Sequence, residues 1–356
     1  MSSSLPRRRL SVRGLLPHLG WEAVLLLAVL AVAVTLGASH TDAYSHGTLW
    51  PLLAWTGPVA SGLALSFRTA TPNLAVGLIS TMSGWVCVNL VVGGMSLVPA
   101  AIVGVLLALG VGAVLGVIVG LSSMPAWAVT LVAGLVVQGA LMAGSDAANL
   151  KTIPGGVSKD TDFIVWAALF AVVSVGGGVL FAVVPGLRAL LSANRPDADG
   201  VPGRWRATRL LGALVGLAGS SAAAGFGGVL LVAWERVGQP SDTGLLPYAV
   251  AAVLLGGVSV FGRRAGVFGV LLGVTLIGLV RLWEILDGAG SGIITLTFGL
   301  FALVGIGVNR LLEWLDPLVE GPPEAPRPTP VPPHQPLPQQ PATPWSPAPP
   351  SLRPGS

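Results

Sequence analysis

The sequence has 356 residues, of which 53% are hydrophobic and only 10% are charged. Soluble domains carry about 25% charged residues, so this composition excludes a water-soluble globular protein. The net charge of +4 comes from basic residues that lie between long apolar runs, a distribution typical of membrane orientation signals and not of nucleic-acid binding.

Ten apolar runs approach or exceed the roughly 20 residues that a membrane-spanning helix needs. They predict an all-α, polytopic helical bundle of about ten transmembrane helices, with a transmembrane domain at residues 21–312 after a cytoplasmic N-terminal segment at 1–20. In chain order the runs are 21–38, 49–67, 72–92, 97–120, 125–143, 162–184, 208–233, 245–261, 265–286 and 290–312.

Two of these runs leave alternatives open. The run 245–261 is short, so nine or eight spans are also possible. The first run follows Arg7, Arg8 and Arg9 and ends near a Leu-Gly-Ala sequence, which leaves a cleaved signal peptide as an alternative to a first membrane helix.

The distribution of Lys and Arg predicts the orientation, because these residues accumulate in cytoplasmic loops. With the N-terminus inside and ten alternating spans, fifteen of the nineteen basic residues lie on the inner side. Those on the outer side are Lys151, Lys159, Arg236 and Arg281. The sequence therefore predicts that both ends of the chain are cytoplasmic.

Residues 313–356 are predicted to form a disordered cytoplasmic tail. Within it, residues 321–356 hold 15 of the 29 prolines and few large apolar residues. A solvated low-complexity segment is the preferred interpretation. A partner that recognises PxxP sequences is the alternative.

Small residues recur at a spacing of four in several runs. One series contains Gly112, Gly116 and Gly120, and another extends from Gly212 to Gly228. Such series let helix backbones approach closely in lipid, so they predict a tightly packed bundle.

The sequence contains no catalytic or metal-binding motif, so it predicts no catalytic residue, no metal site and no enzyme activity. Neither lysine lies in a phosphate-loop sequence, so we expect no cofactor in this chain. The charges within the runs include Glu22, Arg281 and Glu284, the last two spaced to pair on one helix, and Asp162, Arg209 and Arg310 lie at run ends. So few ionisable groups argue against proton coupling, whereas sodium coupling stays open.

Neutral polar side chains within the runs suit a path for an uncharged, hydrogen-bonding solute such as a sugar. The predicted path residues are Asn73, Trp85, Asn89 and Gln138. The alternative for any one of them is a hydrogen bond to a neighbouring helix.

The longest inner loop, residues 185–207, mixes four arginines with two aspartates. Positive-inside topology explains the arginines but neither the length nor the acidic residues. A loop of this kind offers a soluble motor protein a place to hold the bundle.

Residues 251–280 resemble the permease subunits of ABC importers for ribose, galactose and similar monosaccharides, within the broader branched-chain amino acid and monosaccharide permease family. The residues that match the family motif are Gly256, Gly257, Ser259, Gly262, Arg264, Gly269 and Gly273, whereas Arg263 departs from it. Weaker likeness extends to 70–77, where Asn73 stands in place of an Asp, and to 124–144, where Gln138 stands in place of an Arg.

The resemblance covers roughly residues 50–312 and implies a multi-pass protein of the bacterial inner membrane. It also implies a permease homodimer or heterodimer, two cytoplasmic ATPase subunits that bind the ATP, and an external or periplasmic solute-binding protein. The loop 185–207 is similar to the family's ATPase-coupling segment, which suggests ATPase contacts for Asn194, Arg195, Gly200 and Arg204.

We therefore predict a permease that transports a monosaccharide or similar small polar solute. The same fold with a nucleoside or branched-chain amino acid as cargo is one alternative. An ion-coupled secondary carrier and a non-transporting membrane scaffold are the others.

Overall fold

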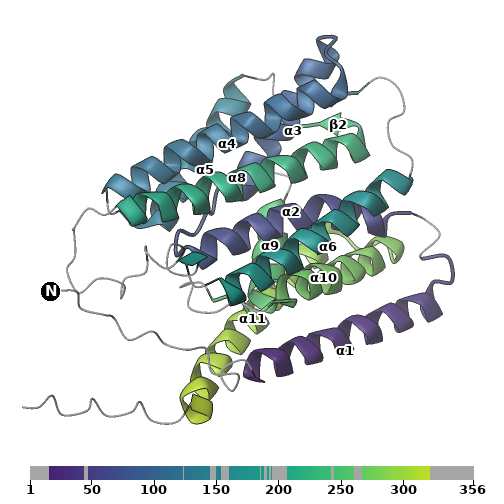
Figure 1. Cartoon of the computed structure of the whole chain (residues 1–356). Coiled ribbons are helices and arrows are strands. Elements are labelled where there is room, and N and C mark those ends of the chain that lie inside the picture. Colours follow the sequence, from purple (N-terminus) through teal and green to yellow (C-terminus); the bar gives the residue numbers. More distant parts are fainter. Residues whose placement is uncertain are drawn as a thin grey trace, which may run out of the picture. The chain divides into compact units, whose positions relative to one another are not determined.

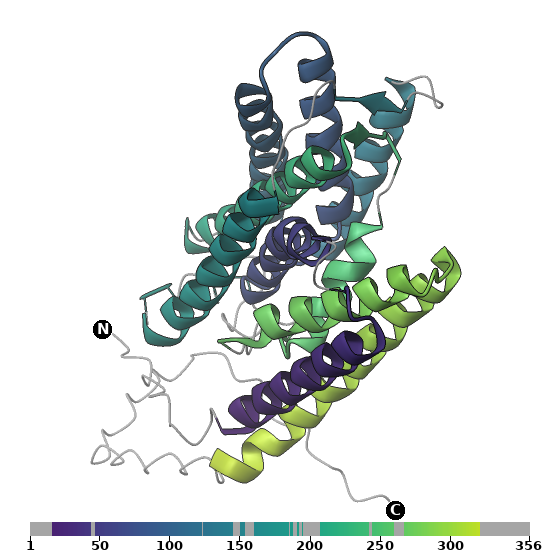
Figure 2. The ribbon, with the colours of Figure 1, turned by 90° about the vertical axis from the view of Figure 1, so that its right-hand side faces the viewer.

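The computed structural model describes residues 16–43, 47–122, 124–144, 150–153, 160–184, 186–187, 191, 194, 207–241, 244–259 and 267–320. Across these ranges the chain forms ten helices and one two-stranded sheet (Figures 1 and 2). The helices are α1 (Leu16–Ser39), α2 (Leu49–Arg68), α3 (Val76–Val92), α4 (Leu97–Ser122), α5 (Ala126–Ala143), α6 (Asp160–Val183), α8 (Ala207–Glu235), α9 (Leu245–Leu255), α10 (Gly269–Leu286) and α11 (Ser291–Glu320). The strands β1 (Lys151–Thr152) and β2 (Val237–Gly238) pair antiparallel.

Each of the ten predicted runs corresponds to one helix, which confirms the helical membrane fold. Seven helices in the described ranges are long and apolar enough to cross a bilayer, namely α1, α4, α5, α6, α8, α10 and α11. Helix α3 has 17 residues and α9 has 11. At 1.5 Å per residue α9 rises about 16 Å, roughly half of the hydrocarbon thickness.

Some predicted boundaries are wrong by several residues. Helix α9 ends at Leu255 instead of 261, and α10 begins at Gly269 instead of 265. The early end of α9 has a local cause, since Gly257 adopts a φ of 73°, which terminates a right-handed helix.

The first and last helices are longer than the runs that predicted them. Helix α1 begins at Leu16, and α11 continues to Glu320, so residues 313–320 are helical and do not belong to an irregular tail. Residues 1–15 and 321–356 lie outside the described residues.

Helix α8 lies between α4 and α2 (Figure 1), and it also packs against α3. The glycine series make these approaches possible. A β-carbon on Gly116 or Gly120 of α4 would lie 2.9 Å from the Cα atom of Leu214 or Leu210 of α8. The predicted close packing through small residues is confirmed.

Long-range polar contacts pair segments that we predicted to lie on the same side of the membrane. His40 contacts Asp287, and β1 pairs with β2, all in segments predicted to be outer. Trp21, at the predicted inner end of the first run, donates to the carbonyl of Leu255 in the predicted inner half of the run 245–261. We call these two ends of the bundle the outer end and the inner end, and their cytoplasmic or external assignment stays a prediction.

Candidate functional site

The chain between α2 and α3 is not helical although it lies inside the bundle. Asn73 is fully buried there, and its Nδ2 atom donates hydrogen bonds to the hydroxyls of Ser220 (2.7 Å) and Ser221 (3.1 Å) on α8. Ser221 also faces Gly112 near the middle of α4. The irregular segment is therefore deep in the bundle, where backbone polar groups must find partners within the protein.

Side chains supply those partners. The Asn73 backbone N–H donates to the Ser66 hydroxyl (3.1 Å), and the Ala75 N–H donates to Asn73 Oδ1 (3.1 Å). Thr130 of α5 accepts from the Leu74 N–H (3.1 Å) and donates to the Pro72 carbonyl (3.0 Å). Asn73 thus joins α2, α3 and α8. Its predicted place on the solute path stays a prediction.

Trp85 and Asn89 lie one turn apart on α3 near the outer end, and both contact Lys151 of β1. The Asn89 Nδ2 atom donates to the Trp85 carbonyl (2.7 Å), and Lys151 Nζ donates to Asn89 Oδ1. The Lys151 ammonium also lies 5.5 Å from the centre of the Trp85 ring, a cation–π distance. Sequence reasoning missed this role of Lys151, although a lysine among so few outer basic residues was a signal.

Gln138 of α5 also bonds the segment that contains the small sheet. Its Nε2 atom donates to the carbonyl of Pro240 (3.2 Å), two residues after β2. Three of the four predicted path residues therefore contact the strands β1 and β2 or the residues beside them. Asn73 lies deeper, between α3 and α8.

A small cavity lies between α3 and α8, next to Val237 of β2. The cavity is lined by Ser80, Thr81, Gly84, Gly228, Leu231, Val232, Glu235, Val237 and Gln239. Ser80 is fully buried, and its hydroxyl has no hydrogen-bond partner among the described residues. A buried hydroxyl without a partner is costly, so the cavity presents an unused polar group.

Of the four residues predicted to contact the ATPase, the structure describes only Asn194. The Asn194 Nδ2 atom donates to the carbonyl of Arg209 (3.1 Å) in the first turn of α8. This bond joins Asn194 to the helix that contacts α2, α3 and α4. Arg195, Gly200 and Arg204 lie outside the described residues.

The described family-motif residues lie at the end of α9 and at the start of α10. A β-carbon on Gly256 would lie 2.6 Å from the carbonyl oxygen of Gly269, so the two helix ends touch through their backbones. Ser259 is buried, and its hydroxyl has no partner within the described ranges. Gly262 and Arg264 lie outside those ranges.

Side chains of α1 and α11 satisfy the free backbone groups of this turn. The Trp21 indole N–H donates to the Leu255 carbonyl (2.8 Å), and Asn309 donates to the Leu254 carbonyl (3.1 Å). The Glu22 carboxylate accepts from the backbone N–H groups of Phe268 (2.8 Å) and Gly269 (3.0 Å). Sequence reasoning placed Glu22 only at a span end, although a lone carboxylate in an apolar run signals a buried partner.

Comparison with known proteins gives a consistent set of relatives, although no protein-family profile and no solved structure matches the chain. The ribose import permease of Escherichia coli K12 is 28% identical over 279 residues, 72% of this chain and 83% of its own. The L-arabinose ABC transporter permease of Azospirillum brasilense is 27% identical over 278 residues, 73% of this chain and 80% of its own. The fructose import permease of Rhizobium meliloti is 25% identical over 317 residues, 82% and 84% of the two chains.

Over most of its length this chain is similar to the permease subunits of monosaccharide ABC importers. The permease is a multi-pass protein of the bacterial inner membrane and a transport subunit, not an enzyme. Among the residues that the structure describes, no group of three or more His, Cys, Asp or Glu side chains lies close enough together to hold a metal ion.

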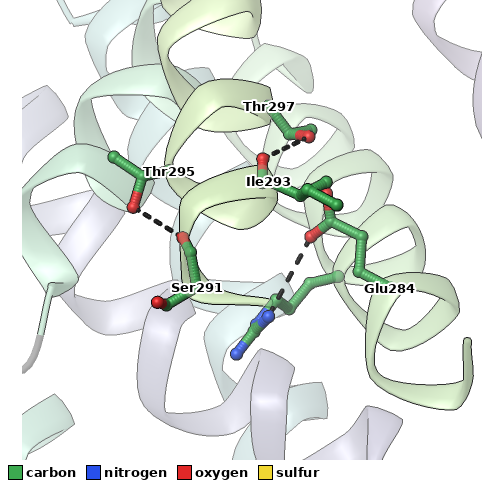
Figure 3. Close-up of polar contacts among 6 residues, drawn as sticks. Glu284, Ser291, Ile293, Thr295 and Thr297 are labelled. Atoms are coloured by element: carbon green, nitrogen blue, oxygen red, sulfur yellow. Dashed lines mark hydrogen bonds and ion pairs between the residues drawn. The ribbon is translucent and has the colours of Figure 1, made fainter. Parts of the chain in front are cut away.

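The permease carries a second polar region where α10 meets α11 at the outer end. Arg281 Nη1 lies 4.0 Å from Glu284 Oε2 (Figure 3), which confirms the predicted spacing of this pair. An open hollow of about 530 Å³ lies beside Trp283, Glu284 and Asp287. Asp287 is in turn bonded to His40 Nε2 at 2.9 Å, which connects the ends of α1 and α10.

Proposed function

We propose that this permease forms the membrane path for a monosaccharide in an ABC importer, paired with a second permease subunit that is identical or related. The observation that carries the proposal is the consistent cargo of its relatives. Permeases named for ribose, fructose, allose and arabinose each match at least 72% of the chain. The neutral polar residues between α3 and α8 suit hydroxyl-rich solutes, since they can donate and accept hydrogen bonds without charge.

Energy and delivery come from other chains in this proposal. A cytoplasmic ATPase binds and hydrolyses ATP, and an external solute-binding protein delivers the sugar to the outer end. The segment 185–207 contacts the ATPase through Asn194, Arg195, Gly200 and Arg204. The hydrogen bond from Asn194 to the first turn of α8 supports this. Through it, a displacement of Asn194 would be transmitted to α8, which contacts α2, α3 and α4.

Deletion of the gene in the native host tests the cargo. Uptake of labelled ribose, fructose, allose and arabinose is measured with and without the full-length gene returned on a plasmid. We expect loss of uptake of at least one sugar and its recovery with the plasmid. Loss of nucleoside or branched-chain amino acid uptake alone, with all four sugars unaffected, would contradict the proposal.

Purification of the tagged full-length permease from host membranes tests the coupling segment. We expect an ATPase subunit to co-purify with the wild type and to be lost when residues 185–207 are replaced by a Gly/Ser linker of equal length. Equal recovery of the ATPase with both proteins would show that the contact lies elsewhere.

A further inference from the structure

Two charged side chains are buried among the described residues, Glu22 and Arg68, with exposed fractions of 5% and 9%. The contacts of Glu22 explain its burial, since its carboxylate accepts hydrogen bonds from the backbone at the start of α10. Arg68 takes no part in the features described so far. A cation inside a membrane bundle is costly and usually serves a function, so the groups around Arg68 indicate what it does.

Arg68 joins the end of α2 to the end of α6. It is the last residue of α2, and its guanidinium carbon lies 5.5 Å from the centre of the Phe181 ring in the last turn of α6. This is a cation–π distance, and the attraction is stronger where water is excluded. Both side chains are buried. Three residues separate Phe181 from the segment 185–207, so Arg68 contacts the helix that leads directly into that segment.

Arg68 is followed at once by the irregular connection before α3. The hydroxyls of Thr69 and Thr71 lie 2.6 Å apart, and a β-carbon on Gly216 of α8 would collide with both. Between them Ala70 adopts a φ of 54°, which residues other than glycine rarely do. The connection is therefore held tightly between the end of α2 and α8.

The segment 185–207 reaches this connection by two separate routes. Before the segment, the last turn of α6 contacts Arg68. Within it, Asn194 bonds the carbonyl of Arg209 on α8, the helix that also lies against the two threonines. The connection then leads to Asn73, which bonds α8 a second time. A displacement of the segment would therefore reach the break before α3 through α6 and through α8.

We propose that Arg68 is a positioning residue that couples the segment 185–207 to the break before α3 through its contact with Phe181. The inference rests on the proposed function, in which that segment contacts the ATPase. When ATP binding or hydrolysis displaces the segment, the end of α6 moves, and the guanidinium moves with the Phe181 ring. Arg68 touches neither the solute nor the ATPase, and it acts by transmitting the movement to α2.

The amount of sugar imported per ATP hydrolysed measures this coupling. It is determined for the whole importer, purified with its ATPase subunits, in proteoliposomes supplied with the labelled sugar identified by the gene deletion and the host's binding protein for that sugar. We expect Arg68→Gln to retain the ATPase subunits but to lower the ratio at least fivefold, because a neutral amide cannot make the cation–π contact. Arg68→Lys should recover part of the loss, since an ammonium group can also lie over an aromatic ring.

Changes on α6 test the same contact from its other side. Phe181→Leu removes the ring and keeps the cation, so it should lower the ratio as Arg68→Gln does. The double variant should be no worse than either single variant, because all three lose one shared contact. Phe170→Leu is the matched control: Phe170 is buried on α6 and lies against Gly57 of α2, so it joins the same two helices without a charge. It should leave the ratio unchanged.

The outcomes separate this inference from the proposed function. A wild-type complex that lacks an ATPase subunit or imports no sugar would contradict the proposed function. A working wild type whose ratio is unchanged in Arg68→Gln and Phe181→Leu would overturn the role of Arg68 alone. If Arg68→Gln does not fold, Phe181→Leu decides, because it keeps the charge. An equal loss in Phe170→Leu would also overturn the inference, since packing of α2 on α6 would then set the coupling without the cation.

Discussion

Single side chains keep this membrane bundle intact where its helices are interrupted. Glu22 is an example, since one carboxylate oxygen accepts hydrogen bonds from both backbone N–H groups at the start of α10. Asn73 does the same for the break before α3 through Ser220, Ser221 and its own Oδ1 atom. In lipid such groups have no water to bond, so these residues determine whether an interrupted helix is stable.

Replacement of Glu22 by Ala should therefore destabilise the protein. Two buried backbone N–H groups lose a charged acceptor, which costs about 1–3 kcal/mol. Thermal unfolding of the purified permease in detergent should show a lower midpoint for Glu22→Ala. Glu22→Gln is the matched control, because its side-chain oxygen can still accept a hydrogen bond, and it should lose less. An unchanged midpoint for Glu22→Ala would show that the carboxylate does not support the turn.

At the scale of elements, the pairing of α9 with α10 depends on glycine. Gly256 and Gly269 bring the two helix ends into backbone contact, and Ala252 lies against Gly273 further along the same pair. The family-motif glycines thus have a structural reason for their positions: a side chain there would push the helices apart. Trp21, Glu22 and Asn309 can reach the turn only because the helix ends meet.

Gly256→Ala should separate these helix ends, since its added carbon would lie 2.6 Å from the Gly269 carbonyl oxygen. We expect a loss of about 1–3 kcal/mol, the usual cost of overpacking, measured as a lower unfolding midpoint. Gly110→Ala on α4 is the control, because nothing lies within 4 Å of the added carbon. That variant should be neutral or stabilised by about 0.5–1 kcal/mol. A Gly256→Ala protein as stable as Gly110→Ala would contradict this packing.

At the scale of the whole molecule, the segments that connect the helices lie at two ends of one bundle, and their contacts show which segments share an end. The predicted outer segments contact one another through β1 and β2 and through His40 and Asp287. At the predicted inner end, Trp21 at the start of the first run bonds Leu255, and Asn194 of the inner segment 185–207 bonds Arg209 at the start of the next run. This arrangement is compatible with the ten alternating passes predicted from the sequence, one of which contains the short α9.

Cysteine labelling in intact cells tests the orientation predicted from the loop charges. In a Cys87→Ala background, Ser241→Cys should react with a membrane-impermeant maleimide, because it is exposed in a segment predicted to be external. Ser122→Cys, exposed at the inner end of α4, should react only after the cells are permeabilised. The reverse pattern would invert the topology.

The sequence by itself determined the positions of the ten helices and the presence of small-residue series that allow close packing, and it predicted the alternation of the connections. These features depend on local hydropathy, on loop charge and on small residues at a regular spacing, all of which are present in short windows of sequence. The tertiary structure alone decided which polar residues meet. Lys151 reaches Trp85 and Asn89 across 62 or more residues, and Glu22 reaches Gly269 across 247. No window contains such pairs, because they arise only when distant helices pack and buried polar groups must find partners.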